Sequence, residues 1–133
     1  MGNTVLLTPS VHGGDAAADS NLAVHAHCTA KPATPGSVTL AYANMAESVT
    51  FTIDGASISG ARTEYVLKQA NSSQPLEQAR QLVFNDDPAP LAVGTGAVPA
   101  LAGKSVAAGV SLVVAPVTIG WAVFADAKAA ACM

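Results

Sequence analysis

The strongest constraint on the fold is an alternation of large apolar and small polar residues with a period of two. In the segment Ser48 to Ile53, Val49, Phe51 and Ile53 alternate with serine and threonine. Because successive side chains of a β-strand point to opposite faces, this pattern predicts a strand with one buried face and one exposed face. Val49, Phe51 and Ile53 are therefore predicted to point into the core.

The same periodicity recurs along the chain and predicts further strands. They are expected at Thr4 to Thr8, Asn21 to Cys28, Ser37 to Ala43, Ala56 to Ser59, Glu64 to Gln69, Val106 to Val114 and Thr118 to Ala125. Asp54-Gly55 tolerates the positive φ angles of a tight hairpin turn and separates two of them. Many short strands between turn signals predict an all-β fold, a small antiparallel β-sandwich or barrel.

Helix signals are almost absent. Pro75 to Leu82 is the one short helix expected, because proline suits a first helical turn and Glu77 and Arg80 stand three residues apart. A strand is the alternative there, since Arg80 runs into the β-rich residues up to Phe84.

A chain of 133 residues supports one domain with one core. We expect an N-terminal strand and extended arm at residues 1–20, followed by a single β domain at residues 21–133. The segment 85–103 is a long irregular loop with many prolines and glycines, yet it is rich in Ala, Leu and Val. It is predicted to lie over apolar surface of its own domain or of a partner.

The segment Ser105 to Ala125 holds no charged residue and is nominally long enough to span a bilayer. Gly109, Pro116 and Gly120 interrupt it, and its large and small residues alternate. Two buried strands joined near Pro116 therefore explain it better than a membrane helix. The N-terminus as written lacks the basic and apolar regions of a secretory signal, although an exported chain without its signal remains an alternative.

Charged residues make up only 11% of the chain, against about 25% in an ordinary globular domain. So few charges favour a protein whose surface is covered by neighbours, with a monomer of Ser/Thr/Asn-rich surface as the alternative. The net charge is −3, and the 6 Lys and Arg residues are scattered. Phosphate-backbone binding needs clustered cations, so no direct nucleic-acid partner is expected.

His25 and His27 would point to the same side of a strand, with Cys28 on the other side and His12 upstream. Zinc normally takes three or four ligands, and no further Cys/His pair lies nearby. A solvent-facing histidine pair is the preferred interpretation, and no metal is predicted. Cys28 and Cys132 are far apart in sequence, and free thiols are predicted in preference to a disulfide.

Gly96 to Ser105 resembles a phosphate-binding loop but has the wrong glycine spacing, and a strand rather than a helix is expected after it. Asp86-Asp87 precedes a proline and is read as a turn. Ser10 and His12 lack an identifiable oriented base or oxyanion hole. We therefore expect no catalytic residue, no cofactor and no enzymatic activity.

The closing segment Thr118 to Ala127, with the sequence TIGWAVFADA, resembles the end of some tailed-phage capsid decoration (cement) proteins. The resemblance covers about the last quarter of the chain and its Ala/Gly/Val-rich composition. It implies a small β subunit of the virion that binds at capsid symmetry axes, often as a trimer, and reinforces the shell against the pressure of the DNA.

The expected function is thus that of a non-enzymatic structural or assembly subunit, foremost a capsid decoration protein. Its partners would be copies of itself and a larger protein assembly, without a membrane. Contacts are expected through the termini and the loop 85–103, with the N-terminal arm adding strands to a neighbour's sheet. The alternatives are a small virus coat protein, whose terminal helices and basic inner face are not evident here, and an exported fimbrial or surface β-sandwich subunit.

Overall fold

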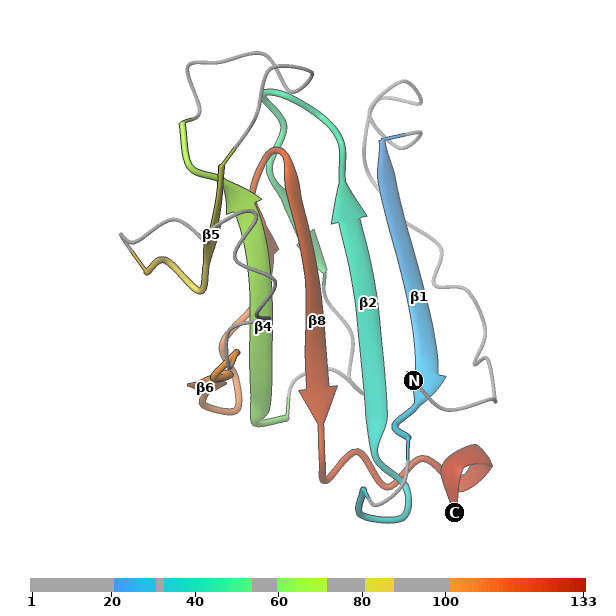
Figure 1. The fold of residues 1–133 in the computed structure, drawn as a ribbon. Helices are drawn as coiled ribbons and strands as arrows, with labels where there is room; N and C mark the ends of the chain where they lie inside the picture. The colour runs from blue at the N-terminus through green and yellow to red at the C-terminus, as the bar shows by residue number, and fades with distance from the viewer. Residues whose placement is uncertain (1–20, 31–32, 54–59, 72–80, 88–100) are drawn as a thin grey trace.

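The computed structural model describes residues 21–30, 33–53, 60–71, 81–87 and 101–133. These residues form short strands and one 3-10 turn near the C-terminus (Figure 1). The elements are β1 (Leu22–Cys28), β2 (Val38–Asn44), β3 (Phe51–Ile53), β4 (Arg62–Gln69), β5 (Leu82–Phe84), β6 (Lys104–Val106), β7 (Leu112–Val114), β8 (Thr118–Phe124) and η3 (Ala130–Cys132).

The strands make two antiparallel sheets. A 6-stranded sheet has the order β1-β2-β8-β4-β5, with β6 also paired to β4, and a 2-stranded sheet joins β3 to β7. Figure 1 shows the large sheet from the front, with the small sheet behind it. The predicted all-β antiparallel fold class is confirmed.

The core lies between the two sheets. The strands β3 and β7 contribute Phe51, Leu112 and Val114, which pack against the large sheet. Its facing side chains are Val24 from β1, Leu40 and Tyr42 from β2, and Ala122 and Phe124 from β8. Burial of these apolar side chains is the main favourable contribution to folding.

The alternation that predicted a strand at Ser48 to Ile53 is confirmed for its second half. Phe51 is buried, Ile53 is partly buried and Thr52 is exposed. Val49 is exposed and the strand begins only at Phe51, so the prediction that Val49 points into the core is wrong. The Asn44 side-chain amide donates a hydrogen bond of 2.8 Å to the Val49 carbonyl, which ties Val49 into the turn before the strand.

The strand predicted at Val106 to Val114 is also wrong, because this segment belongs to two sheets. It contains the end of β6 and all of β7, separated by a turn at Gly109, whose φ is 81°. The strand predicted at Thr118 to Ala125 is confirmed as β8. Within the described residues, no helix is long and apolar enough to cross a membrane.

Several predictions fall on residues that the structure does not describe. They are the strand at Thr4 to Thr8 and the arm at residues 1–20, the hairpin after Asp54-Gly55, residues 75–80 of the expected helix, and residues 88–100 of the irregular loop. These remain predictions. The end of the expected helix at Leu82 is wrong, because Leu82–Phe84 form the strand β5, in agreement with the alternative of a strand that runs up to Phe84.

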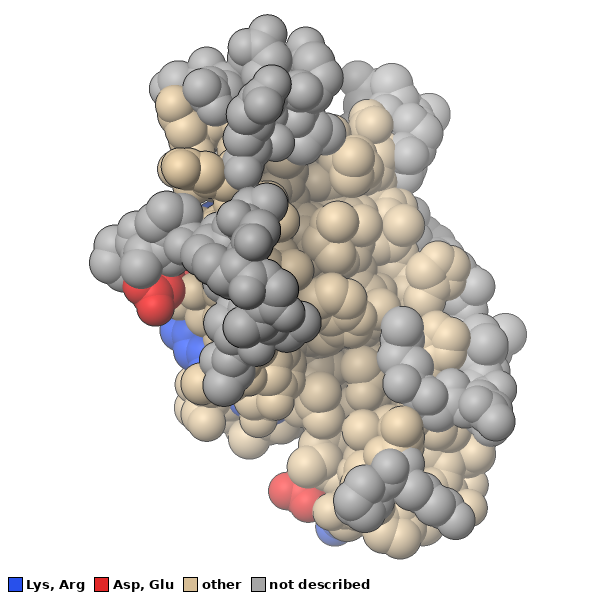
Figure 2. Space-filling view, viewed as in Figure 1, with Lys and Arg blue, Asp and Glu red and all other residues tan. Residues whose placement is uncertain are grey.

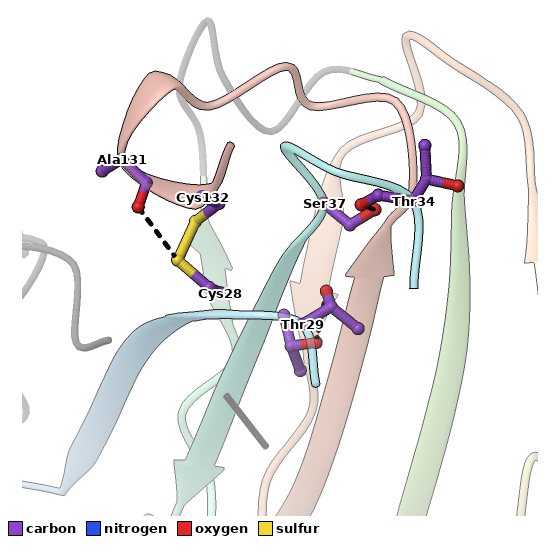
Figure 3. Close-up of a disulfide and its surroundings, with 7 residues drawn as sticks. Cys28, Thr29, Thr34, Ser37, Ala131 and Cys132 are labelled. Carbon is purple, nitrogen blue, oxygen red and sulfur yellow. Dashed lines mark hydrogen bonds between the residues drawn. A yellow bond between two sulfur atoms is a disulfide. The ribbon is translucent and has the colours of Figure 1, made fainter. Parts of the chain in front are cut away.

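Cys28 and Cys132 form a disulfide, so the expectation of free thiols is wrong (Figure 3). Their Cα atoms lie 5.3 Å apart although the residues are 104 positions apart in the chain. The Cys28 sulfur also lies 3.6 Å from the Ala131 carbonyl oxygen. This is a contact rather than a hydrogen bond, since a disulfide sulfur carries no hydrogen.

Backbone hydrogen bonds bring the C-terminal tail to the end of β1. The Gly36 amide donates to the Cys132 carbonyl at 2.8 Å, and the Ala129 amide donates to the Gly36 carbonyl at 3.0 Å. Gly36 has φ 84°, and a Cβ there would stand 3.0 Å from the Lys128 Cα. Glycine at this position therefore permits the close approach of the two backbones that places the cysteines together.

We expect the disulfide to raise the free energy of unfolding, because it closes a loop through almost the whole described domain. Its removal in a Cys28→Ser, Cys132→Ser double variant should cost about 2–5 kcal/mol. Urea unfolding followed by Trp121 fluorescence measures this difference. Added reductant should destabilise the wild type and leave the double variant unchanged; equal stabilities of oxidised and reduced wild type would contradict the expectation.

Candidate assembly surface

The face of the large sheet that points away from β3 and β7, here called the outer face, carries no charged side chain among the described strand residues. The strand register sets its rows, one of which runs through His25, Ala41, Trp121 and Tyr65. Its described members are Ala23, His25, His27, Thr39, Ala41, Ala43, Thr63, Tyr65, Leu67, Gln69, Leu82, Phe84, Ser105, Ile119, Trp121 and Val123. None of them is Lys, Arg, Asp or Glu.

The outer face is only partly covered. Ile119 is 46% exposed, and its neighbours Trp121 and Val123 on β8 are half-buried. By contrast, Ala122 and Phe124 on the opposite face of the same strand are at most 2% exposed. Figure 2 shows uncharged atoms from the centre of this side toward the right, and acidic and basic atoms at its left margin and lower end.

Trp121 and Tyr65 are half-buried aromatic side chains on this surface, whereas Phe84 beside them is buried. Trp121 and Tyr65 occupy paired positions on β8 and β4, and the Tyr65 ring lies 6.4 Å from that of Phe84 on β5, centroid to centroid. Aromatic residues are enriched in protein–protein interfaces, whereas charged residues are depleted in interface cores. The outer face therefore has the composition of a contact surface between proteins.

The charged groups at one margin form an exposed cluster. Asp86 forms an ion pair with Lys68, and its other carboxylate oxygen lies 3.7 Å from the Lys104 Nζ. The hydrogen bond from Lys68 is the largest cause of a lowered pKa of Asp86. Since these side chains are 40–63% exposed, solvent screening makes their contribution to stability small.

One edge of the large sheet is closed by short strands and a side chain. The edge of β4 that is not paired with β8 pairs with β5 at one end and with β6 at the other. Between them the Asn85 side chain takes the place of a peptide group. Its Oδ1 accepts a hydrogen bond of 2.8 Å from the Val66 amide, and its Nδ2 donates to the carbonyls of Glu64 and Ala102 at 3.2 and 2.8 Å. This edge therefore has little backbone left for another strand to pair with.

A buried arginine, paired with a glutamate on its own strand, connects β4 to the chain before β7. The Arg62 Nε lies 2.6 Å from the Glu64 Oε1, and the Arg62 side chain is 1% exposed. The same guanidinium donates hydrogen bonds of 2.6 and 3.0 Å to the carbonyls of Val110 and Ser111. Each of its three nitrogens thus donates a hydrogen bond within the protein, and this arrangement links β4 of the large sheet to the chain that leads into β7 of the small sheet.

The residues considered as metal ligands are not brought together. His25 is exposed and His27 is half-buried, both on the outer face, whereas Cys28 is on the opposite face and in the disulfide. Within the described segments, no group of three or more His, Cys, Asp or Glu side chains could hold a metal ion. His12 and Ser10 lie outside those segments.

The segment Gly96 to Ser105, which was compared with a phosphate-binding loop, runs into a strand rather than a helix, as expected. Lys104 and Ser105 are the first residues of β6, and residues 96–100 lie outside the described part. The reading of Asp86-Asp87 as a turn is confirmed, since the Asp87 amide donates to the Phe84 carbonyl at 2.9 Å. Asn85 and Asp86 have φ of 48° and 63°, which Asn and Asp tolerate better than most residues.

No protein-family model matches this chain, and no curated protein matches it either.

The ion pair of Arg62 and the bridging role of Asn85 are absent from the sequence-based expectations. The sequence does indicate that Arg62 and Glu64 can pair, because they stand two residues apart and therefore lie on the same face of a strand. Sequence alone does not show that this face is the buried one.

Burial of Tyr42 gives stability a dependence on alkaline pH. Burial, and next the Glu64 carboxylate, raise the pKa of Tyr42 to about 12, although Arg62 lowers it. The folded state then holds the phenol proton more tightly than the unfolded state, whose pKa is about 10. The free energy of unfolding should therefore be unaffected below pH 10 and fall between pH 10 and 12, by up to about 1.4 kcal/mol per pH unit.

Chemical denaturation at pH 9, 10 and 11 measures this slope. We expect Tyr42→Phe to flatten it and Tyr65→Phe to retain it, because Tyr65 lies on the half-exposed outer face. A slope that is the same in both variants would show that Tyr42 is not its source.

Proposed function

We propose that this chain is a non-enzymatic structural subunit that packs against other protein subunits through the outer face of its large sheet. The observation that carries the proposal is the uncharged, half-covered surface around Ile119, Trp121 and Tyr65. An apolar area of this kind is stabilised when a partner removes it from water. The scarcity of charge across the whole sequence supports the same conclusion.

The polar clusters in the described residues support a structural role rather than chemistry. Arg62 is bonded to one carboxylate and two carbonyls, and Asn44 is fully buried with its amide bonded to backbone groups. Each cluster fixes one segment of chain against another. A nucleophile with an adjacent oriented base, the usual sign of covalent catalysis, is not among these described clusters.

Two kinds of assembly fit such a subunit. A capsid decoration protein is the one that the closing segment resembles, and a virion would then be its location. An exported fimbrial or surface subunit is the second candidate, and the Cys28–Cys132 disulfide favours it. Disulfides persist mainly in oxidising compartments and are rare in the reducing cytosol. A reduced chain as stable as the oxidised one would remove this support.

A single charge on the outer face tests the proposal. Ile119→Lys places an ammonium group in the middle of the proposed contact, where a partner would have to desolvate it. We expect the dissociation constant for association through this face to rise more than about tenfold, as measured by sedimentation velocity over a concentration series.

Val113→Lys is the matched control, because Val113 is a 57% exposed apolar residue on β7, away from the outer face. It should leave association unchanged. The proposal is contradicted if both variants associate as the wild type does, or if both weaken association equally while circular dichroism shows that they remain folded.

A further inference from the structure

The second edge of the large sheet, strand β1, differs from the closed edge at β4. All 7 residues of β1 pair with β2, and none pairs with any other described strand. Its sequence, LAVHAHC, contains no charge and no proline. Charged residues and proline are the usual devices that prevent an edge strand from pairing with another chain.

The hydrogen bonds that flank β1 show which of its backbone groups point outward. The Met45 amide donates to the Asn21 carbonyl at 2.8 Å, and the Thr29 amide donates to the Ser37 carbonyl at 3.0 Å. In an antiparallel pair, hydrogen-bonded and non-hydrogen-bonded residues alternate. The backbone groups of Ala23, His25 and His27 therefore face β2, and those of the even-numbered residues from Leu22 to Cys28 face away from the sheet.

The apolar side chains at this edge are also incompletely covered. Leu22 and Ala26 point toward the core and pack against it, yet both are only half-buried, whereas Val24 between them is 5% exposed. The edge thus combines outward backbone donors and acceptors with apolar side chains that a neighbouring strand would cover.

We propose that β1 pairs with β1 of a second copy, antiparallel about a twofold axis at His25. This register matches the whole strand and brings outward backbone groups opposite each other: Leu22 opposite Cys28 of the second copy, and Val24 opposite its Ala26. On the core side these contacts cover the half-buried apolar residues. On the outer side His25 meets His25 of the second copy in a non-hydrogen-bonded pair, where side chains are closest.

The absence of charge is what selects a second copy as the occupant. A twofold axis at His25 brings the residues beside the axis near their own equivalents, so a Lys, Arg, Asp or Glu at position 24, 25 or 26 would lie close to like charge. β1 has none. The pairing joins the two large sheets and makes their outer faces one continuous surface, but it does not depend on anything binding to that surface.

A charge-swap experiment tests this register. In the Ile119→Lys background, which weakens contacts through the outer face, His25→Lys and His25→Glu each place like charges at the twofold axis. We expect the parent to have twice the 13.2 kDa chain mass at about 100 µM in light scattering. Each His25 variant should dimerise more than about tenfold more weakly, and an equimolar mixture of the two should recover the dimer. Thr52→Lys, on the exposed side of β3, is the control that should not change the mass.

A monomeric parent over the whole concentration range would overturn the pairing and show that the edge is covered within one chain or lies free. Dimers that persist in both His25 variants, or a mixture that fails to recover the dimer, would overturn the register. In either case an effect of Ile119→Lys on larger species would still stand, so failure of the edge pairing is distinct from failure of the outer-face proposal.

Discussion

The register of β2, β8 and β4 is the constraint on which the remaining structure depends. The β8 residues from Thr118 to Val123 each lie between partners on both sides, such as Ala122 between Leu40 and Glu64, and Trp121 between Ala41 and Tyr65. Because side chains alternate between faces, a shift of one residue would exchange the whole buried set for the exposed set. The register therefore decides that Phe124 and Ala122 contact the small sheet and that Ile119 and Trp121 do not.

This register also explains how a buried charge is accommodated. Arg62 lies on the core face of β4, where an unpaired guanidinium would be strongly destabilising. Glu64, two residues further along, shares that face and neutralises it, while the carbonyls of Val110 and Ser111 each accept a further hydrogen bond. The break between β6 and β7 at Gly109 turns the chain so that these carbonyls reach the guanidinium. The turn that divides one predicted strand into β6 and β7 thus also supplies hydrogen-bond acceptors for the buried Arg62.

The parts of the fold that sequence predicts are those set by local periodicity. Alternation identifies β2, β4 and β8, and the outward position of His25 follows from the same rule. The parts that it does not predict depend on distant contacts. The disulfide forms because the backbone of Gly36 hydrogen-bonds to the C-terminal tail. The position of Val49 depends on the hydrogen bond from the Asn44 amide. The Asn85 side chain hydrogen-bonds to the edge of β4, a strand distant in sequence. The small number of charged residues in the sequence predicts a surface covered by neighbours, but only the strand register shows which face of the sheet lacks charged residues.

The contrast between the two sheet edges is the central claim, and amide hydrogen exchange on β1 tests it most directly. In a dilute, monomeric sample the amides of Ala23, His25 and His27 should be protected by β2, whereas those of Val24 and Ala26 should exchange rapidly. At high concentration Val24 and Ala26 should become protected as well. Equal protection of all five amides in the monomer would show that the outer edge of β1 is already paired within one chain and would contradict the account.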